Sequence, residues 1–357
     1  MPEFGQLIRT TDRGLYCEAG GFYVDPWRPV HRAVVTHAHS DHACYGCRHY
    51  LSSGAGEMLM RLRMPPEAEF QFIRYGETVT VGPVKVSLHP AGHMLGSSMV
   101  RLEHAGRIAL ISGDYKLGSD PTCTPWEPVR CHLLITETTF GLPVYRWPDP
   151  ADVFADINRW WARSAAAGMT SILYGYAIGK SQRLLAGLDT SVGPIYTHGA
   201  VEKGVQAYRD SGIAMPPTTA VSLIDEQSKD RKRFAGAMIV AVPGAHGTPW
   251  IRRFGKMTTA MASGWMAVRG NRRRRSVDRG FILSDHIDWP ELLQATRLCQ
   301  PETIWTVHGY TSVTARYLSE LGYDAQPLWG WNRPTVTESE TADPSKDAGD
   351  GEADPFG

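Results

Sequence analysis

The stretch Thr36-His-Ala-His-Ser-Asp-His42 places three histidines and one aspartate within six consecutive positions, directly after a short apolar run. Imidazole and carboxylate groups are ligands that suit zinc and manganese. Side chains alternate along an extended loop, so His37 and His39 should point to one side while Asp41 and His42 reach the other. A lone histidine is more often a surface or core residue, but this density predicts two adjacent metal positions.

Other apolar runs also end on residues that can do chemistry. Strand ends followed by loops form the sites of layered α/β proteins, because rigid strands fix where the loops present their side chains. The runs are Ala33–Thr36, Val84–Leu88, Ile108–Ile111, Leu133–Thr136, Phe281–Ser284 and Thr303–Val307. They lead in turn to His37, His93, Asp114, Glu137, Asp285 with His286, and His308. The sequence therefore predicts one site formed by six strand ends.

Three of these residues are candidate partners of the first cluster. His93 lies in the glycine-containing turn Pro90–Ser97, which would present its imidazole to a site. Asp114 could instead cap a turn or a helix. A dinuclear site needs a third ligand on the first ion and a bridging carboxylate, so we interpret His93 and Asp114 as metal ligands, and His308 joins them.

Two divalent ions about 3.5–4 Å apart would acidify a water and stabilise charge on a phosphoryl group. Asp41 could help to orient that water as well as bind metal. The leaving oxygen then needs a proton, which His286 could donate if a carboxylate such as Glu137 keeps its imidazole oriented and protonated. The alternatives are that Glu137 is a helix cap or surface acid, and that His286 merely begins a helix.

The organisation of the chain is that of an α/β protein. Helical patterns alternate with the strands, and no repeat of fixed period is visible. We expect a first domain part at residues 1–147, an inserted second domain at 148–277, and the second part of the first domain at 278–334. The helices are expected at Ala151–Ala167, Ser181–Leu188, Ala200–Asp210, Trp289–Leu298 and Ser312–Leu321.

Composition limits the class of protein. The chain has 357 residues, of which 42% are hydrophobic, so it can bury a large core. No apolar stretch is long enough to span a bilayer, and the N-terminus lacks a signal-peptide pattern, so we expect a cytoplasmic protein. Its 6 cysteines are too sparse for a disulfide scaffold and are expected to be thiols. Cys44 and Cys47 have the spacing of half a zinc site, but no second pair accompanies them.

The formal net charge of zero conceals two unlike regions. Residues 335–357 carry seven acids and one lysine, a net charge of −6 that leaves +6 on the rest of the chain. This tail lacks the apolar content to fold, so we expect it to be disordered. Arg272, Arg273, Arg274 and Arg275 form a basic run that predicts a polyanionic partner. Such a run could clamp a nucleic-acid backbone or could be a solvated loop.

Taken together, these residues resemble the metallo-β-lactamase superfamily, whose His-x-His-x-Asp-His motif is matched in full at positions 37–42. Asp25 resembles the early aspartate of that superfamily, which supports the site without binding metal. More narrowly, the chain resembles the β-CASP nucleases over about residues 10–330. The resemblance implies a metallo-β-lactamase αββα sandwich with an inserted α/β β-CASP domain. Glu137, His286 and His308 match the three further motifs of that branch.

The resemblance implies roles for the matched residues. His37, His39 and His93 would hold one ion, and Asp41, His42 and His308 the other. Asp114 would bridge two divalent ions, most naturally zinc, with manganese as the other candidate. His286 would be the general acid, paired with Glu137. Tyr176–Leu184 resembles the helix start of the inserted domain, where Lys180 and Gln182 would contact a phosphate or simply pack.

Within the branch, the short N-terminus and the segment Asp25–Val30 look most like the bacterial ligase-associated DNA exonucleases. This implies a DNA exonuclease in DNA repair, acting beside a DNA ligase and a helicase and, by family analogy, from a 5′ end. DNA-cleaving relatives often lack a histidine at the third motif while RNA-cleaving members have one, so His308 keeps a ribonuclease open. A thioester or lactam hydrolase would share the first cluster but would not explain Glu137, His286 or the insertion.

Overall fold

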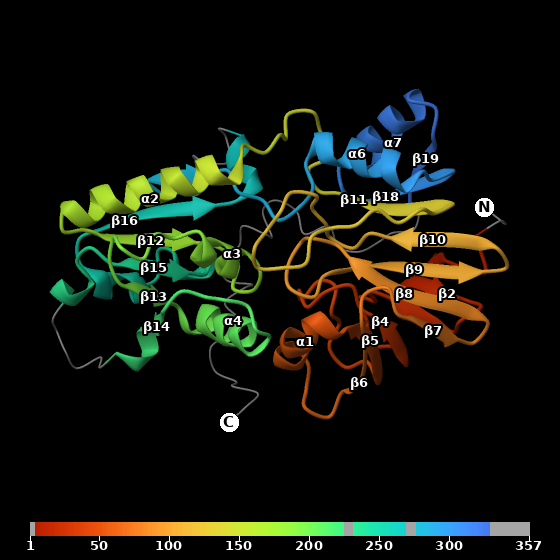
Figure 1. Ribbon diagram of the computed structural model, residues 1–357, viewed down its shortest axis with the longest axis horizontal. Helices are drawn as coiled ribbons and strands as arrows, with labels where there is room; N and C mark the ends of the chain where they lie inside the picture. Colours follow the sequence, from red (N-terminus) through yellow and green to blue (C-terminus); the bar gives the residue numbers. More distant parts are fainter. Residues whose placement is uncertain (1–3, 225–230, 269–275, 329–357) are drawn as a thin grey trace. The chain divides into compact units, whose positions relative to one another are not determined.

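The computed structural model describes residues 4–224, 231–268 and 276–328 of the chain, which divides into two compact units. The first unit contains residues 4–146, 210–213 and 285–328, and the second contains residues 147–209 and 214–284 outside the gaps just given. The first unit is therefore built from segments far apart in the sequence (Figure 1). The mixed α/β composition expected from the sequence is confirmed.

The first unit contains two sheets. The first, in spatial order, consists of β1 (Arg9–Thr11), β2 (Gly14–Cys17), β3 (Phe22–Val24), β4 (Arg32–Val34), β5 (His49–Ser53) and β6 (Glu69–Ile73). The second consists of β19 (Asp324–Pro327), β18 (Thr303–Gly309), β11 (Leu133–Thr138), β10 (Arg107–Ile111), β9 (Ser98–His104), β8 (Val84–Pro90) and β7 (Thr78–Val81). The strands from β3 to β6 pair in parallel, as do β10, β11, β18 and β19.

The two sheets share one apolar core. Residues Val84, Val86 and Leu88 alternate along β8 and are fully buried in it, together with Val34 of the first sheet. This alternation is what a strand with one face in a core requires. The opposite face of the second sheet packs against α6 (Trp289–Cys299), because Leu110 and Leu134 share a cluster with residues of that helix. Helices α1 (Glu57–Arg63) and α7 (Thr311–Glu320) complete the unit.

The second unit is a parallel sheet with helices. Its strands, in spatial order, are β14 (Thr219–Ala220), β13 (Ile195–Thr197), β15 (Met238–Ala241), β12 (Thr170–Tyr174), β16 (Met257–Ala262) and β17 (Arg279–Phe281). Every residue of β12 and β15 is buried, as expected of parallel strands covered on both faces. The helices are α2 (Pro150–Ala166), α3 (Lys180–Ala186) and α4 (Gly199–Asp210).

Short 3-10 helices occupy several connections. They are η1 (Gly54–Gly56), η2 (Val221–Leu223), η3 (Arg231–Phe234), η4 (Pro243–Ala245), η5 (Pro249–Phe254) and η6 (Gly264–Ala267).

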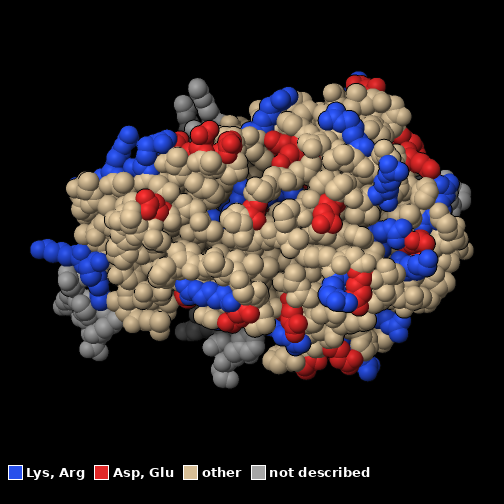
Figure 2. All heavy atoms as spheres, in the orientation of Figure 1, with Lys and Arg blue, Asp and Glu red and all other residues tan. Residues whose placement is uncertain are grey.

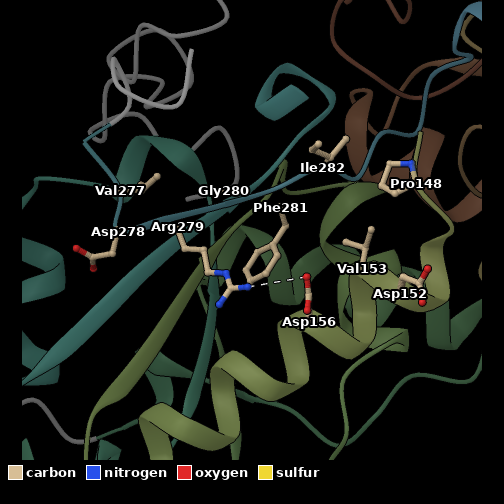
Figure 3. A pocket seen from close by; sticks show the side chains of 10 residues that line it. All are labelled: Pro148, Asp152, Val153, Asp156, Val277, Asp278, Arg279, Gly280, Phe281 and Ile282. Carbon is tan, nitrogen blue, oxygen red and sulfur yellow. Dashed lines mark ion pairs between the residues drawn. The ribbon is translucent and has the colours of Figure 1, made fainter. Parts of the chain in front are cut away.

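The prediction for the end of the insertion was wrong in one respect. The apolar run Phe281–Ser284 was expected to be a strand of the returning first domain, which was placed at 278–334. Instead, β17 ends at Phe281 and pairs in parallel with β16, and the units divide after Ser284. An apolar run predicts a strand but does not specify which sheet will accept it. β17 and α2 line a hollow of about 440 Å³ in the second unit (Figure 3).

The described surface carries both signs of charge. On the face drawn in Figure 2, Lys and Arg side chains are interspersed with Asp and Glu. The basic run at Arg272, Arg273, Arg274 and Arg275 and the acidic tail at 335–357 lie outside the described residues. Among the helices that the structure describes, none combines the length and the apolar character needed to cross a membrane.

Candidate metal centre

Three histidine rings of the first unit converge on one point. Nδ1 of His39 lies 3.1 Å from Nε2 of His37 and 3.2 Å from Nε2 of His93. A single N–H on His39 can satisfy only one of these contacts, so hydrogen bonding alone does not account for the arrangement. Ligands at about 2.0–2.1 Å around a tetrahedral zinc are separated by roughly 3.3 Å. The spacing of the three nitrogens therefore fits a metal ion.

The carboxylate of Asp114 lies beside these nitrogens. Its Oδ2 is 3.6 Å from Nε2 of His37, 3.9 Å from Nε2 of His93 and 3.4 Å from Nε2 of His42. The ligand atoms of His37, His39, His93 and Asp114 all lie within 4.8 Å of one another. Asp114 thus lies next to His42 as well as to the three converging histidines, which is the position required of a bridging carboxylate.

Asp25 organises the loop after β4. It is buried, and its Oδ1 and Oδ2 accept hydrogen bonds from the backbone N–H and hydroxyl of Thr36, at 2.8 and 2.6 Å. Oδ2 also lies 2.6 Å from Nδ1 of His42. Asp25 has a φ of 42°, a left-handed conformation that Asp tolerates better than most residues. Its carboxylate therefore joins the two ends of the histidine stretch.

In the buried rings of His37, His93 and His42, the ring nitrogen that points away from Asp114 has a hydrogen-bond partner. We call these the outer nitrogens. Nδ1 of His37 lies 3.0 Å from the hydroxyl of Thr36, and Nδ1 of His93 lies 2.8 Å from the carbonyl oxygen of Asp285. With Nδ1 of His42 held by Asp25, these contacts leave the Nε2 atoms directed at Asp114. Such outer partners fix the tautomer and orientation of ligating histidines.

If the hydrogen-bond partners of the outer ring nitrogens orient the histidines, removing one partner should weaken metal binding. We expect Asp25→Ala to weaken metal affinity about 10–100-fold, because the orientation of His42 and of the Thr36 loop is lost. Titration of the metal-free protein against a competing chelator measures this change. Asp12→Ala, which removes an exposed carboxylate of the same unit, is the matched control. Equal affinities of the two variants would contradict the prediction.

Burial, together with neighbouring charges, sets the ionisation of the candidate metal ligands. It lowers the pKa of His37 well below its ordinary value, with a further lowering from the neighbouring His42 and His39. Burial lowers the pKa of His93 in the same way, assisted by His286. Although burial alone would raise it, the pKa of Asp114 is held well below its ordinary value by His42 and His286. Neutral imidazole and ionised carboxylate are the forms that bind metal.

Glu137 and His286 form a second pair beside Asp114. Nδ1 of His286 lies 3.0 and 3.1 Å from the two carboxylate oxygens of Glu137. Glu137 is fully buried in β11, where it also accepts hydrogen bonds from the N–H of Tyr115 and the hydroxyl of Thr139. Burial opposes the charged imidazole, but Glu137 and Asp114 outweigh it and raise the pKa of His286 to about 9. Glu137 therefore orients the imidazole of His286 and favours its charged form.

The other predicted ligands lie around His42. Oδ2 of the half-exposed Asp41 is 3.7 Å from Nε2 of His42. His308 is in β18 with a φ of 56°, and its ring centroid lies 5.8 Å from that of His42. The hydroxyl of Thr138 donates to its carbonyl oxygen. All seven predicted ligands therefore lie in the first unit. The residues predicted for the first ion, His37, His39 and His93, lie close together, whereas those predicted for the second ion, Asp41, His42 and His308, are more widely spaced.

The predicted nucleic-acid residues of the second unit are buried. Only 4% of Lys180 is exposed, and its Nζ donates to the carbonyl oxygen of Leu283 at 2.9 Å. Gln182 is fully buried and donates to the carbonyl oxygens of Ala177 and Val201. Both side chains thus face the interior rather than a phosphate. The glycine-led helix start resembled a phosphate site, but polar side chains there satisfy buried carbonyls instead.

Two hydrogen bonds made by the segment that precedes His286 were not expected from the sequence. Arg183 is 4% exposed and donates to the carbonyl oxygen of Ser284. The carbonyl oxygen of Asp285 is the partner of a predicted ligand, His93. Arg183 lies three residues after Lys180, so it shares a helix face with it, but nothing in the sequence shows what that face meets.

Comparisons with known proteins add independent information. No protein-family profile matches the chain. The chain is 32% identical over 348 residues, 94% of its length, to a probable DNA ligase of Opitutus terrae, of which it spans only 33%. It is 29% identical to the RNase aCSPSF2 of Saccharolobus solfataricus over 33% of this chain and 24% of that protein. It is 28% identical to the endoribonuclease YSH1 of Saccharomyces cerevisiae over 34% of this chain and 16% of that protein.

A solved structure shares the fold. A protein of unknown function from Enterococcus faecalis superposes with a TM-score of 0.52 at 13% identity, covering 78% of this chain and 75% of the other. The relatives named as an RNase and as endoribonucleases share with this chain a segment of about a third of its length, which is 14–24% of their own length. The His/Asp cluster of this chain could hold a metal ion.

Proposed function

We propose that this chain is a β-CASP metallo-β-lactamase nuclease that hydrolyses phosphodiester bonds of DNA, as an exonuclease in DNA repair. The observation that carries the proposal is that the ionised Asp114 lies between two kinds of group. On one side are the converging rings of His37, His39 and His93, and on the other is the Glu137–His286 pair. Phosphodiester hydrolysis needs both an activated water and a proton for the leaving oxygen.

The residues divide this work between them. Two divalent ions in the Asp114 cluster, zinc or manganese, would supply the acidified water and stabilise the charge on the phosphoryl group. Glu137 accepts from Nδ1 of His286 and keeps that imidazole charged, so its other ring nitrogen can protonate the leaving oxygen. Asp41, half exposed and 3.7 Å from His42, would orient the water. Thr139 and Tyr115 donate to Glu137 and fix its carboxylate.

DNA is the preferred substrate because the similarity that extends over 94% of the chain is to part of a probable DNA ligase. The relatives named as an RNase or as endoribonucleases match shorter segments, between 20% and 51% of the chain. In that relative, the matching segment is part of the same chain as a probable DNA ligase. We therefore propose that this chain processes DNA ends before they are joined, with a ligase and a helicase as partners. By analogy with the family, we propose that the exonuclease digests DNA from the 5′ end.

An RNA substrate is the second candidate. The relatives named as an RNase or as endoribonucleases match the chain at 27–36% identity, and His308 stands at the end of β18 as in RNA-cleaving members of the branch. A thioester or lactam hydrolase leaves the buried Glu137–His286 pair unexplained.

A digestion series distinguishes these substrates. Metal-loaded protein is incubated with DNA and RNA of one sequence, single- and double-stranded, labelled at the 5′ or the 3′ end. We expect metal-dependent cleavage of DNA at least ~10-fold faster than of RNA, with shortening from the 5′ end. Asp41→Ala controls for contaminating nucleases. Faster cleavage of RNA would favour the ribonuclease, and no metal-dependent cleavage of either polymer would refute the proposal.

A further inference from the structure

Residues 282–288 lie between β17 and α6 and contain His286, yet they form neither helix nor strand. They are not an exposed loop, because Leu283, Ser284 and Asp285 are only 3–5% exposed. Buried backbone carbonyl groups outside helices and sheets need other hydrogen-bond donors. The partners of this segment therefore decide where its backbone lies.

Two cations of α3 supply such donors within the second unit. Nζ of Lys180 donates to the carbonyl oxygen of Leu283 at 2.9 Å, and Nη1 of Arg183 donates to that of Ser284. Both cations are 4% exposed. Burying a charge is costly unless it is hydrogen-bonded, and charged donors make the stronger hydrogen bonds. Each cation therefore holds one backbone carbonyl of this segment through a charged, buried donor.

The next residues are held in the first unit. Nδ1 of His93 lies 2.8 Å from the carbonyl oxygen of Asp285, and Nδ1 of His286 lies 3.0 Å from Glu137. Three consecutive carbonyl groups, at positions 283–285, are therefore bound by side-chain donors immediately before the proposed general acid.

We propose that Lys180 and Arg183 are positioning residues for His286, acting through the backbone of Leu283 and Ser284. The inference rests on the proposed function of His286 as proton donor. Losing either donor frees a buried carbonyl, which turns toward another partner and moves the chain that follows. A displacement of about 1 Å at a reacting group can cost 10²-fold in rate. Proton donation would then fail while water activation at the metal centre continues.

The experiment compares two leaving groups on one DNA sequence. One oligonucleotide has the natural bridging oxygen, and the other has sulfur at the bridging position that leaves. A thiolate leaves without a proton, so its departure does not depend on a general acid. For Lys180→Met we expect kcat on natural DNA to fall about 10–100-fold with KM unchanged. The rate on the sulfur-bridged DNA and the bound metal per chain should stay at the wild-type level.

Two control variants match the changes. Lys203→Met makes the same substitution at an exposed position of α4. Arg279→Met removes a cation of β17 that pairs with Asp156 of α2 only loosely, at 3.9 Å, and is 40% exposed (Figure 3). Exposed pairs of this kind contribute little. Both controls should cleave the two oligonucleotides at wild-type rates.

A double-mutant cycle completes the test. With His286 replaced by Ala, adding Lys180→Met should cause no further loss, because a positioning residue has nothing left to position. Equal losses on both leaving groups, or wild-type cleavage of natural DNA by Lys180→Met, would overturn the inference and leave the proposed function intact. If Lys180→Met does not fold by circular dichroism, Arg183→Lys, which keeps the buried charge but moves the donor, is judged by the same criteria. A wild-type protein that cleaves neither DNA would overturn the proposed function itself.

Discussion

Asp114→Asn is expected to abolish metal-dependent cleavage, with a loss of at least ~10³-fold. The carboxylate lies 3.4–3.9 Å from Nε2 of His37, His42 and His93, so a neutral amide there loses the attraction that would hold two divalent ions together. Metal ions contribute several kcal/mol of charge stabilisation in such sites, and about 1.4 kcal/mol corresponds to a tenfold rate. The amide keeps the size of the side chain, so the fold should survive.

Metal content is the second measurement for Asp114→Asn. We expect two ions per wild-type chain and at most one in the variant, determined by elemental analysis after dialysis. Asp12→Asn is the control, since Asp12 is an exposed acid of the same unit whose nearest cation, Arg28, is 3.6 Å away. A variant with full metal content and full cleavage would show that Asp114 is not a bridging ligand.

His286→Ala is expected to slow cleavage of natural DNA about 10²–10⁴-fold, the usual contribution of a general acid. Its Nδ1 lies 3.0 Å from a carboxylate oxygen of the buried Glu137, which favours the charged form of the imidazole and raises its pKa against the effect of burial. The sulfur-bridged DNA should be cleaved at nearly the wild-type rate, because its leaving group needs no proton. Rates on the two oligonucleotides under single-turnover conditions measure the difference.

The companion variant Glu137→Gln tests the pair. The amide can still occupy the buried position in β11 but no longer stabilises a charged imidazole, so we expect a loss on natural DNA approaching that of His286→Ala. The double variant should lose no more than His286→Ala alone, because the two residues act as one unit. His104→Ala, at a partly exposed histidine of the first unit, is the control. A loss that is the same for oxygen and sulfur leaving groups would contradict general-acid catalysis.

Much of the metal centre could be predicted from the sequence because its ligands are dense or follow strands. His37, His39 and His42 come from one loop, and His93 and Asp114 follow β8 and β10 of one sheet. Strand periodicity is local, so it placed those ends correctly. The same reasoning gave the wrong sheet for the run at Phe281, since pairing with β16 joins residues about 20 positions apart.

What the sequence determined by itself was therefore the set of candidate ligands and the strands that present them, because ligand chemistry and strand alternation depend on residue type and spacing alone. Only the tertiary structure decided which nitrogen of each histidine faces Asp114, since that depends on partners such as Asp25 and the carbonyl of Asp285. It also decided that Lys180 and Gln182, which the sequence offered as phosphate contacts, donate to buried carbonyl groups. Both outcomes depend on contacts between residues far apart in the chain, which no local pattern specifies.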